Sequence, residues 1–171
     1  MAQLAVTAVG ADRPGIIARV TGVLLQHGGN LEDSSMTILG GQFAIALLVA
    51  TESSAEALEQ ALADATGDLG LLVSVREIGP GSHNPAPTHM LSVYGTDRPG
   101  IVHGIAQVLA DQRVNVTDLT TRVLDGERPV YAMMLEISLP DGVSQDALVA
   151  ALRQDVTEVE VSLRALDDTA L

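Results

Sequence analysis

The stretch Gly10-Ala11-Asp12-Arg13-Pro14-Gly15-Ile16-Ile17 occurs twice in this chain. It returns as Gly95-Thr96-Asp97-Arg98-Pro99-Gly100-Ile101-Val102, so that Asp12 recurs as Asp97 after 85 residues, and six of the eight positions are identical. The same offset carries Asn30 onto Asn115. A spacing kept over such a distance indicates two copies of one structural unit.

The first copy has the pattern of a β-α-β-β-α-β unit. A short alternating run predicts a first strand, and helical spacing of apolar residues follows until Gly28-Gly29, where glycine favours a helix end. The tight Gly40-Gly41 turn predicts a hairpin. The expected elements are strands at 4–9, 30–39, 42–51 and 71–78, with one helix starting near Pro14 and a second capped by Ser53-Ser54.

The second copy repeats this order. The expected elements are strands at 90–94, 116–124, 129–137 and 158–164, a helix at 99–112, a helix within 141–155, and a hairpin turn around Asp125-Gly126. We predict an α+β chain of two ferredoxin-like units, each a four-stranded antiparallel sheet with two helices on one face. The predicted domains are 1–79 and 89–166, with a Gly- and Pro-rich linker at 80–88 and a tail at 167–171.

Composition narrows the functional classes. With 47% hydrophobic residues but one Phe, two Tyr and no Trp, the core is expected to be aliphatic, and Met133-Met134 is expected to pack in it. The net charge is −13, and the nine basic residues are scattered arginines without any lysine. Nucleic-acid binding needs a basic patch, so direct contact with DNA or RNA is not expected. The absence of lysine also excludes Schiff-base and P-loop chemistry.

Enzymatic and metal sites are not expected either. The chain has no cysteine, which excludes thiolate catalysis and thiolate zinc sites, and it contains no Gly-x-Ser-x-Gly motif. No two of the four histidines, His27, His83, His89 and His103, have the spacing of a helical metal site. We therefore predict a non-enzyme without a metal or cofactor. With no basic leader and no long apolar run, we expect a cytoplasmic protein that does not bind a membrane.

The repeated motif suits a small anionic ligand. The first backbone N–H groups of a helix have no partner inside the helix and carry partial positive charge, so they can bind a carboxylate. Gly15 and Gly100 would let a ligand approach the backbone, and Asp12 and Asp97 could accept hydrogen bonds from an ammonium group. These features together suit a free amino acid.

A purely structural interpretation also accounts for the motif. Asp12 could be the N-cap of the helix, with Pro14 in the first turn, and duplication would copy a cap as readily as a binding site. Asn30 could likewise serve in the turn after the helix, because asparagine tolerates positive φ. Spacing alone leaves both interpretations open.

The Asp-Arg-Pro-Gly-Ile sequence, followed by a helix and by Gly-Gly-Asn-Leu-Glu-Asp-Ser at 28–34, resembles the ACT domain, a small-molecule-sensing module. The second copy, with Asn-Val-Thr-Asp-Leu-Thr-Thr-Arg at 115–122, is similar, and the resemblance covers residues 3–166. The whole chain resembles the tandem-ACT group of the glycine cleavage system transcriptional repressors. The same opening also resembles the N-terminal ACT domain of formyltetrahydrofolate deformylases, whose catalytic domain we do not find in this sequence.

The resemblance implies that two ACT units pair side by side and bind amino acids at the seam between them. One site would combine the first motif with the second copy's asparagine, and the reciprocal site would exchange these roles. The implied ligand-binding residues are Asp12, Arg13, Pro14, Gly15, Ile16, Asn115 and Val116 in one site, and Asp97, Arg98, Pro99, Gly100, Ile101, Asn30 and Leu31 in the other. The copies differ where Ala18-Arg19 becomes His103-Gly104 and Gly28-Gly29 becomes Arg113-Val114, so the two sites could differ in affinity.

The expected function is therefore that of a small regulatory protein that binds glycine or another small amino acid and signals through a protein partner, as in transcriptional control of amino-acid metabolism. Ligand binding between two domains biases their arrangement and gives a physical route for signalling. The alternative is a ligand-free interaction module that docks on an enzyme or regulator. Free sheet edges also favour a homodimer.

Overall fold

The computed structural model describes residues 2–79, 85–124 and 129–166. The chain divides into two compact units, unit 1 up to residue 82 and unit 2 from residue 83 onward. Several sequence predictions lie outside the described residues, namely residues 80–84 of the predicted linker at 80–88, His83, the turn around Asp125-Gly126 and the tail at 167–171.

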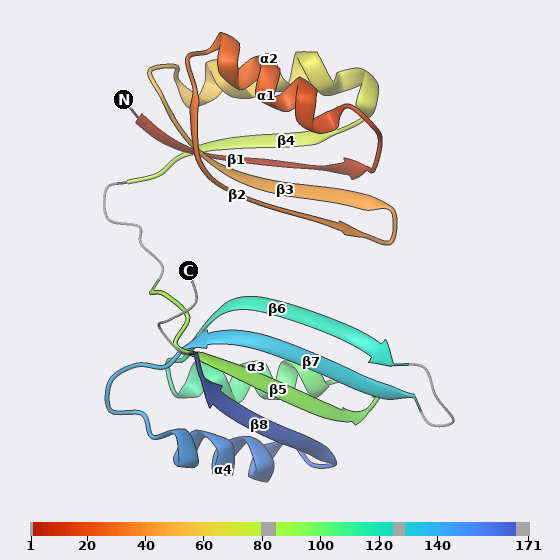
Figure 1. The fold of residues 1–171 in the computed structure, drawn as a ribbon, viewed down its shortest axis with the longest axis vertical. Coiled ribbons are helices and arrows are strands. Elements are labelled where there is room, and N and C mark those ends of the chain that lie inside the picture. The colour runs from red at the N-terminus through yellow and green to blue at the C-terminus, as the bar shows by residue number, and fades with distance from the viewer. Residues whose placement is uncertain (1, 80–84, 125–128, 167–171) are drawn as a thin grey trace. The chain divides into compact units, whose positions relative to one another are not determined.

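Unit 1 is a four-stranded sheet covered on one face by two helices (Figure 1). Its strand order is β2-β3-β1-β4, and every neighbouring pair is antiparallel. A one-turn 3-10 helix, η1, at Gly67–Leu69 was not predicted from the sequence. The elements are β1 (Ala2–Ala11), α1 (Ile16–Gln26), β2 (Asn30–Leu39), β3 (Gln42–Thr51), α2 (Ala55–Thr66) and β4 (Leu72–Glu77).

Unit 2 repeats this topology, with strand order β6-β7-β5-β8 and antiparallel pairing throughout. Its two helices also lie on one face of the sheet (Figure 1). The elements are β5 (His89–Thr96), α3 (Ile101–Asp111), β6 (Asn115–Leu124), β7 (Val130–Ser138), α4 (Gln145–Asp155) and β8 (Val159–Ala165). The predicted fold, two β-α-β-β-α-β units, is confirmed.

Each unit has its own aliphatic core between the sheet and the helices. In β3, Phe43 and Val49 are 2% and 0% exposed, with Ile45 and Leu47 buried between them. The residues that alternate with these face away from the helices, because successive side chains of a strand point to opposite faces. In β7 the same alternation buries Met133 but leaves Met134 45% exposed, so the prediction that both methionines belong to the core was wrong for Met134.

The first helix of each unit ends in a left-handed residue. Gly28 after α1 has φ 62°, and Arg113 at the equivalent place after α3 has φ 58°. Behind Arg113, the N–H of Val114 donates to the carbonyl of Leu109 at 2.9 Å, which closes the helix end. The geometry of the helix end is thus kept although glycine is replaced, at the cost of a side chain in a strained conformation.

Strands β2 and β6 form one edge of their sheets. All ten residues of β2 are exposed, and apolar side chains such as Met36 and Ile38 are about half exposed, at 50% and 51%. In β6, Leu119 and Val123 are similarly exposed, at 45% and 48%. No described helix is both long and apolar enough to cross a membrane.

Candidate functional site

The repeated motif forms the loop between the first strand and the first helix of each unit. In unit 1 the backbone N–H of Asp12 donates to the carbonyl of Gly41 at 2.9 Å, which ties the loop to the β2–β3 turn. The side chains of Asp12, Arg13 and Pro14 are exposed. Asp97, Arg98 and Pro99 are exposed in the same loop of unit 2.

The glycine that opens each motif is explained by packing. A Cβ at Gly10 would lie 2.7 Å from Cδ2 of Leu71, and a Cβ at Gly95 would lie 2.9 Å from Cγ1 of Val159. Contacts this short force the neighbouring side chain to shift, and the carbonyl oxygens of Gly70 and Glu158 lie 3.1 Å and 3.0 Å from the same two positions. Part of the repeated sequence therefore serves the fold and not a ligand.

Neither aspartate caps a helix, so the capping prediction was wrong. Helix α1 begins at Ile16, its N-cap residue is Gly15, and no side chain caps it. Asp12 lies three residues before that position, so its carboxylate does not stand where an N-cap side chain meets the first N–H groups. Pro14 likewise precedes the first turn. The same holds for α3, whose N-cap is Gly100, again without a side-chain cap.

The uncapped helix starts are accessible to a ligand. Gly15 and Gly100 have φ values of 92° and 95°, and a Cβ at either position would meet nothing within 4 Å. The first N–H groups of each helix therefore lack both an intrahelical partner and a side-chain acceptor, at the positive end of the helix dipole. The side chains of Ile16 and Ile101 are buried in the core, so these two predicted residues offer only their backbone to a ligand.

The two motif loops differ in how their arginine is used. In unit 2 the guanidinium of Arg98 donates to the carbonyl of Thr157 at 2.6 Å, which holds the loop against the end of α4. Arg13 makes no hydrogen bond or ion pair with the part of the chain that the structure describes. A hollow of about 390 Å³ lies at the unit 2 motif, lined by Asp97, Arg98, Pro99, Gly100, Ile101, Val102 and Tyr131.

Unit 1 instead ties α1 to η1 through Arg19. The Arg19 guanidinium donates to the carboxylate of Asp68 and, at 3.1 Å, to the carbonyl of Ala65. The hydrogen bond from Arg19 lowers the pKa of Asp68 below its ordinary value. The equivalent residue in unit 2 is Gly104, where a Cβ would come within 3.2 Å of Val156, so close packing of α3 accounts for that difference between the copies.

The predicted asparagines begin the edge strands. Asn30 and Asn115 are the first residues of β2 and β6, both exposed, and each is followed within three residues by a register shift in the ladder. Such irregularities are common beside functional sites. The prediction that asparagine takes the left-handed turn position was wrong, because Gly28 and Arg113 take it instead.

Within one unit the motif and the asparagine lie at opposite ends of the first helix. Asp12 precedes α1 and Asn30 follows it, and an 11-residue helix is about 16 Å long. Leu31 and Val116 lie beside the asparagines, at the same distant end of their units. The structure therefore does not bring the predicted loop and strand residues together within a unit.

His27 and His89 are engaged in local hydrogen bonds. Nδ1 of His27 lies 3.2 Å from the hydroxyl of Ser53, and His89 contacts Thr88 and Gln145 through its two ring nitrogens. The described residues contain no group of three His, Cys, Asp or Glu side chains that could hold a metal ion.

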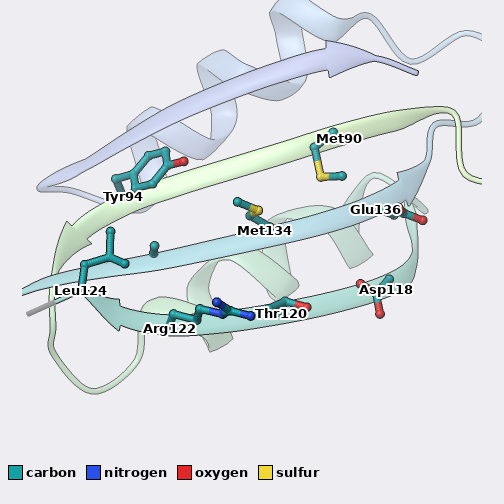
Figure 2. Close-up of a pocket in the computed structure, with 9 residues that line it drawn as sticks. Met90, Tyr94, Asp118, Thr120, Arg122, Leu124, Met134 and Glu136 are labelled. Carbon is teal, nitrogen blue, oxygen red and sulfur yellow. The ribbon is translucent and has the colours of Figure 1, made fainter. Parts of the chain in front are cut away.

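A feature that sequence reasoning missed is a hollow of about 480 Å³ on the sheet face of unit 2 opposite the helices (Figure 2). Period-2 alternation could have found it, because the residues two apart in β5, β6 and β7 share this face. Its lining residues are Met90, Tyr94, Asp118, Thr120, Arg122, Leu124, Ala132, Met134 and Glu136.

With this geometry established, similarity to known proteins decides the family. The family model of the ACT domain matches residues 2–76 and again residues 88–165. The chain belongs to the ACT-domain family. It carries two ACT units in tandem, as the motif repeat predicted.

Relatives of this tandem ACT protein cover either the whole chain or one unit. It is 27% identical over 147 residues to the glycine cleavage system transcriptional repressor of Escherichia coli, a match that spans 84% of this chain and 77% of the relative. It is 40% identical over 79 residues to a UPF0237 protein of Methanopyrus kandleri, spanning 44% of this chain and 88% of the relative. Among solved structures, an unknown protein from Galdieria sulphuraria superposes with a TM-score of 0.84 at 27% identity, covering 97% of this chain and 99% of that one.

Proposed function

We propose that this tandem ACT protein is a regulatory protein that binds glycine or another small amino acid at a seam between two ACT units and transmits the occupancy to a protein partner. Its similarity to a transcriptional repressor supports a role in transcriptional control. Because the net charge is −13, this protein would exert such control by binding a partner protein and not by contacting DNA directly.

The observation that carries the proposal is the separation of the motif from the asparagine. The uncapped helix start near Asp12 and the exposed Asn30 lie a helix length apart in one unit, about 16 Å. A single small amino acid cannot contact both. A site that uses the loop of one unit and the asparagine of another resolves this, because the second unit supplies the missing half.

The edge strands offer the surface for such pairing. β2 and β6 carry unpaired backbone groups along one side and half-exposed apolar residues such as Met36 and Leu119. Antiparallel pairing of two such edges would place the start of one strand near the end of the other. The start carries the asparagine, and the end of β2 leads to Gly41, whose carbonyl holds the motif loop.

The chemistry of the two halves is complementary to a zwitterion. The ligand carboxylate would accept hydrogen bonds from the backbone N–H groups at the start of α1 or α3. Its ammonium group would donate to Asp12 or Asp97, and the side-chain amide of Asn115 or Asn30 would complete the site. Because the ligand contacts both units, binding favours the paired arrangement over the separated one.

Thermal unfolding of the full chain against each of the twenty amino acids at millimolar concentration tests this proposal. A ligand at 100 times its Kd stabilises the protein by about 2.7 kcal/mol, which for this size corresponds to a shift of roughly 5–10 °C. One or two small amino acids should shift the transition, and the double variant Asp12→Ala with Asp97→Ala should lose the shift.

The matched control is Asp64→Ala, an exposed aspartate of α2 that should leave the ligand-induced shift intact. If no amino acid shifts the wild-type transition, the sensor function is refuted. The ligand-free interaction module would then take its place. The half-exposed apolar residues of β2 and β6 favour that alternative, since exposed apolar strand edges are docking surfaces.

A further inference from the structure

The face of the unit 2 sheet opposite the helices, called the open face below, carries charged side chains around the apolar side chain of Met134. Asp118 and Glu136 are direct partners across β6 and β7, and Arg122 lies four residues along the same strand from Asp118. Four residues of a strand place the Cα atoms of Asp118 and Arg122 about 13 Å apart. Figure 2 shows the two carboxylates at one end of the hollow, the Arg122 guanidinium extending along β6 toward Thr120, and Met134 on the neighbouring strand β7.

These charges are not neutralised within the described chain. The side chains of Asp118, Glu136 and Arg122 make no hydrogen bond or ion pair with any residue that the structure describes. Like charges directly opposite each other on a sheet are destabilising. The pair of carboxylates therefore favours a bound cation, and the isolated guanidinium favours a bound anion.

Unit 1 provides an internal comparison. Asp33 is paired with Leu48 where Asp118 is paired with Glu136, so one of the two carboxylates is missing. At the other unit 1 positions that correspond to the lining of the hollow, the side chains are also smaller or uncharged. In unit 1, Thr37 pairs with Ala44 and Ser35 with Ala46, whereas in unit 2, Arg122 pairs with Ala132 and Thr120 with Met134. The fold thus does not require the charges of unit 2.

We propose that this face is a second ligand site, distinct from the seam, for a basic amino acid with an aliphatic stem such as lysine. The ligand carboxylate binds Arg122, and its side-chain cation lies between Asp118 and Glu136. The stem packs on Met134. The inference does not depend on the proposed seam site, because none of these residues is among those named for that site.

The spacing of the charges selects this class of ligand. Because no ion pair within 4.0 Å joins Arg122 to either carboxylate, the charges at the two ends do not neutralise each other, and a ligand that carries opposite charges at its two ends would satisfy both. In glycine and other short amino acids the two charges are adjacent. A basic amino acid separates its carboxylate from its terminal cation by methylene groups, and the volume of about 480 Å³ is in the range of small-molecule sites.

Isothermal titration calorimetry of the full chain with L-lysine, norleucine and cadaverine tests the assignment. Norleucine lacks the terminal cation and cadaverine lacks the carboxylate, so each should bind about tenfold or more weakly than lysine. Arg122→Thr and Glu136→Leu install the residues that unit 1 has at these places, and each should also weaken lysine binding about tenfold or more.

The matched control is Arg76→Thr, the same change at an exposed arginine of β4 in unit 1, which should keep wild-type affinity for lysine. If thermal unfolding shows that Arg122→Thr or Glu136→Leu is not folded, Arg122→Gln and Glu136→Gln replace them. The proposal is overturned if lysine gives no saturable heat up to millimolar concentration, or if the folded variants bind it like wild type.

A further variant separates this site from the seam. Asp12→Ala with Asp97→Ala should abolish the response to a small amino acid but leave lysine binding unchanged. Loss of lysine binding in that double variant would place lysine in the seam and overturn the assignment to the open face. If the double variant loses only its response to the small amino acid, the assignment of lysine to the open face is supported.

Discussion

Gly15 and Gly100 hold the same backbone conformation, with φ of 92° and 95°, and each stands directly before the first helix of its unit. This conformation lets the chain enter the helix without a capping side chain. The aspartate three residues earlier is thereby left exposed, and the helix start is left open. The two glycines thus account for a first helix that begins without a capping side chain in both units.

Gly15→Ala and Gly100→Ala should each destabilise the protein by about 1 kcal/mol, because a side chain at this φ is strained. No steric clash contributes, since a Cβ at either place meets nothing within 4 Å. Gly22→Ala in the middle of α1 is the control and should stabilise by about 0.5–1 kcal/mol. Urea unfolding curves measure all three, and a stabilising effect of Gly15→Ala would contradict the observed conformation.

The second helix of each unit should depend on a serine cap, unlike the first. Ser54 and Ser144 accept hydrogen bonds from the N–H groups of Ala57 and Ala147. Ser54→Ala and Ser144→Ala should each cost about 1 kcal/mol of the free energy of unfolding. Asp12→Ala should cost close to nothing without ligand. An equal loss for Asp12→Ala in chemical denaturation would restore the capping interpretation.

Arg113→Gly should stabilise unit 2. Arg113 has φ 58°, the conformation that Gly28 takes in unit 1. Removing the side chain relieves left-handed strain of about 1–2 kcal/mol, offset by the greater freedom of glycine in the unfolded chain, so a gain of roughly 0.5–1 kcal/mol is expected. The reciprocal change Gly28→Arg should lower stability. Thermal unfolding of both variants gives the comparison, and the same sign for both would refute it.

Arg19→Ala should raise the pKa of Asp68 toward its ordinary value. The hydrogen bond from Arg19 is the main cause of the lowering, and the charge of Arg13 is the smallest contribution. Because the folded-state pKa is depressed, the pair stabilises the fold above the unfolded pKa, and this stabilisation is lost as the pH falls through the folded-state pKa. NMR titration of the Asp68 carboxyl carbon measures the shift, with Arg13→Ala as a control of smaller effect. An unchanged Asp68 pKa in Arg19→Ala would contradict this assignment.

The repeat made the architecture predictable. Alternation in β3 located Phe43 and Val49 in the core, and Gly40-Gly41 located the hairpin, because both signals act over a few residues. Helix starts were less predictable. Proline and aspartate in the motif suggested a cap near Asp12, but the left-handed Gly15 delays α1 until Ile16.

The sequence by itself determined the duplicated β-α-β-β-α-β order, the aliphatic core and the identity of the motif, since these follow from local periodicity and from the repeat. Only the tertiary structure decided that the N–H of Asp12 meets the carbonyl of Gly41 in the hairpin turn, and that Asp118, Glu136 and Arg122 share one open face. Both relationships depend on the direction of strands and on their register, and hydrogen bonding between distant segments sets these.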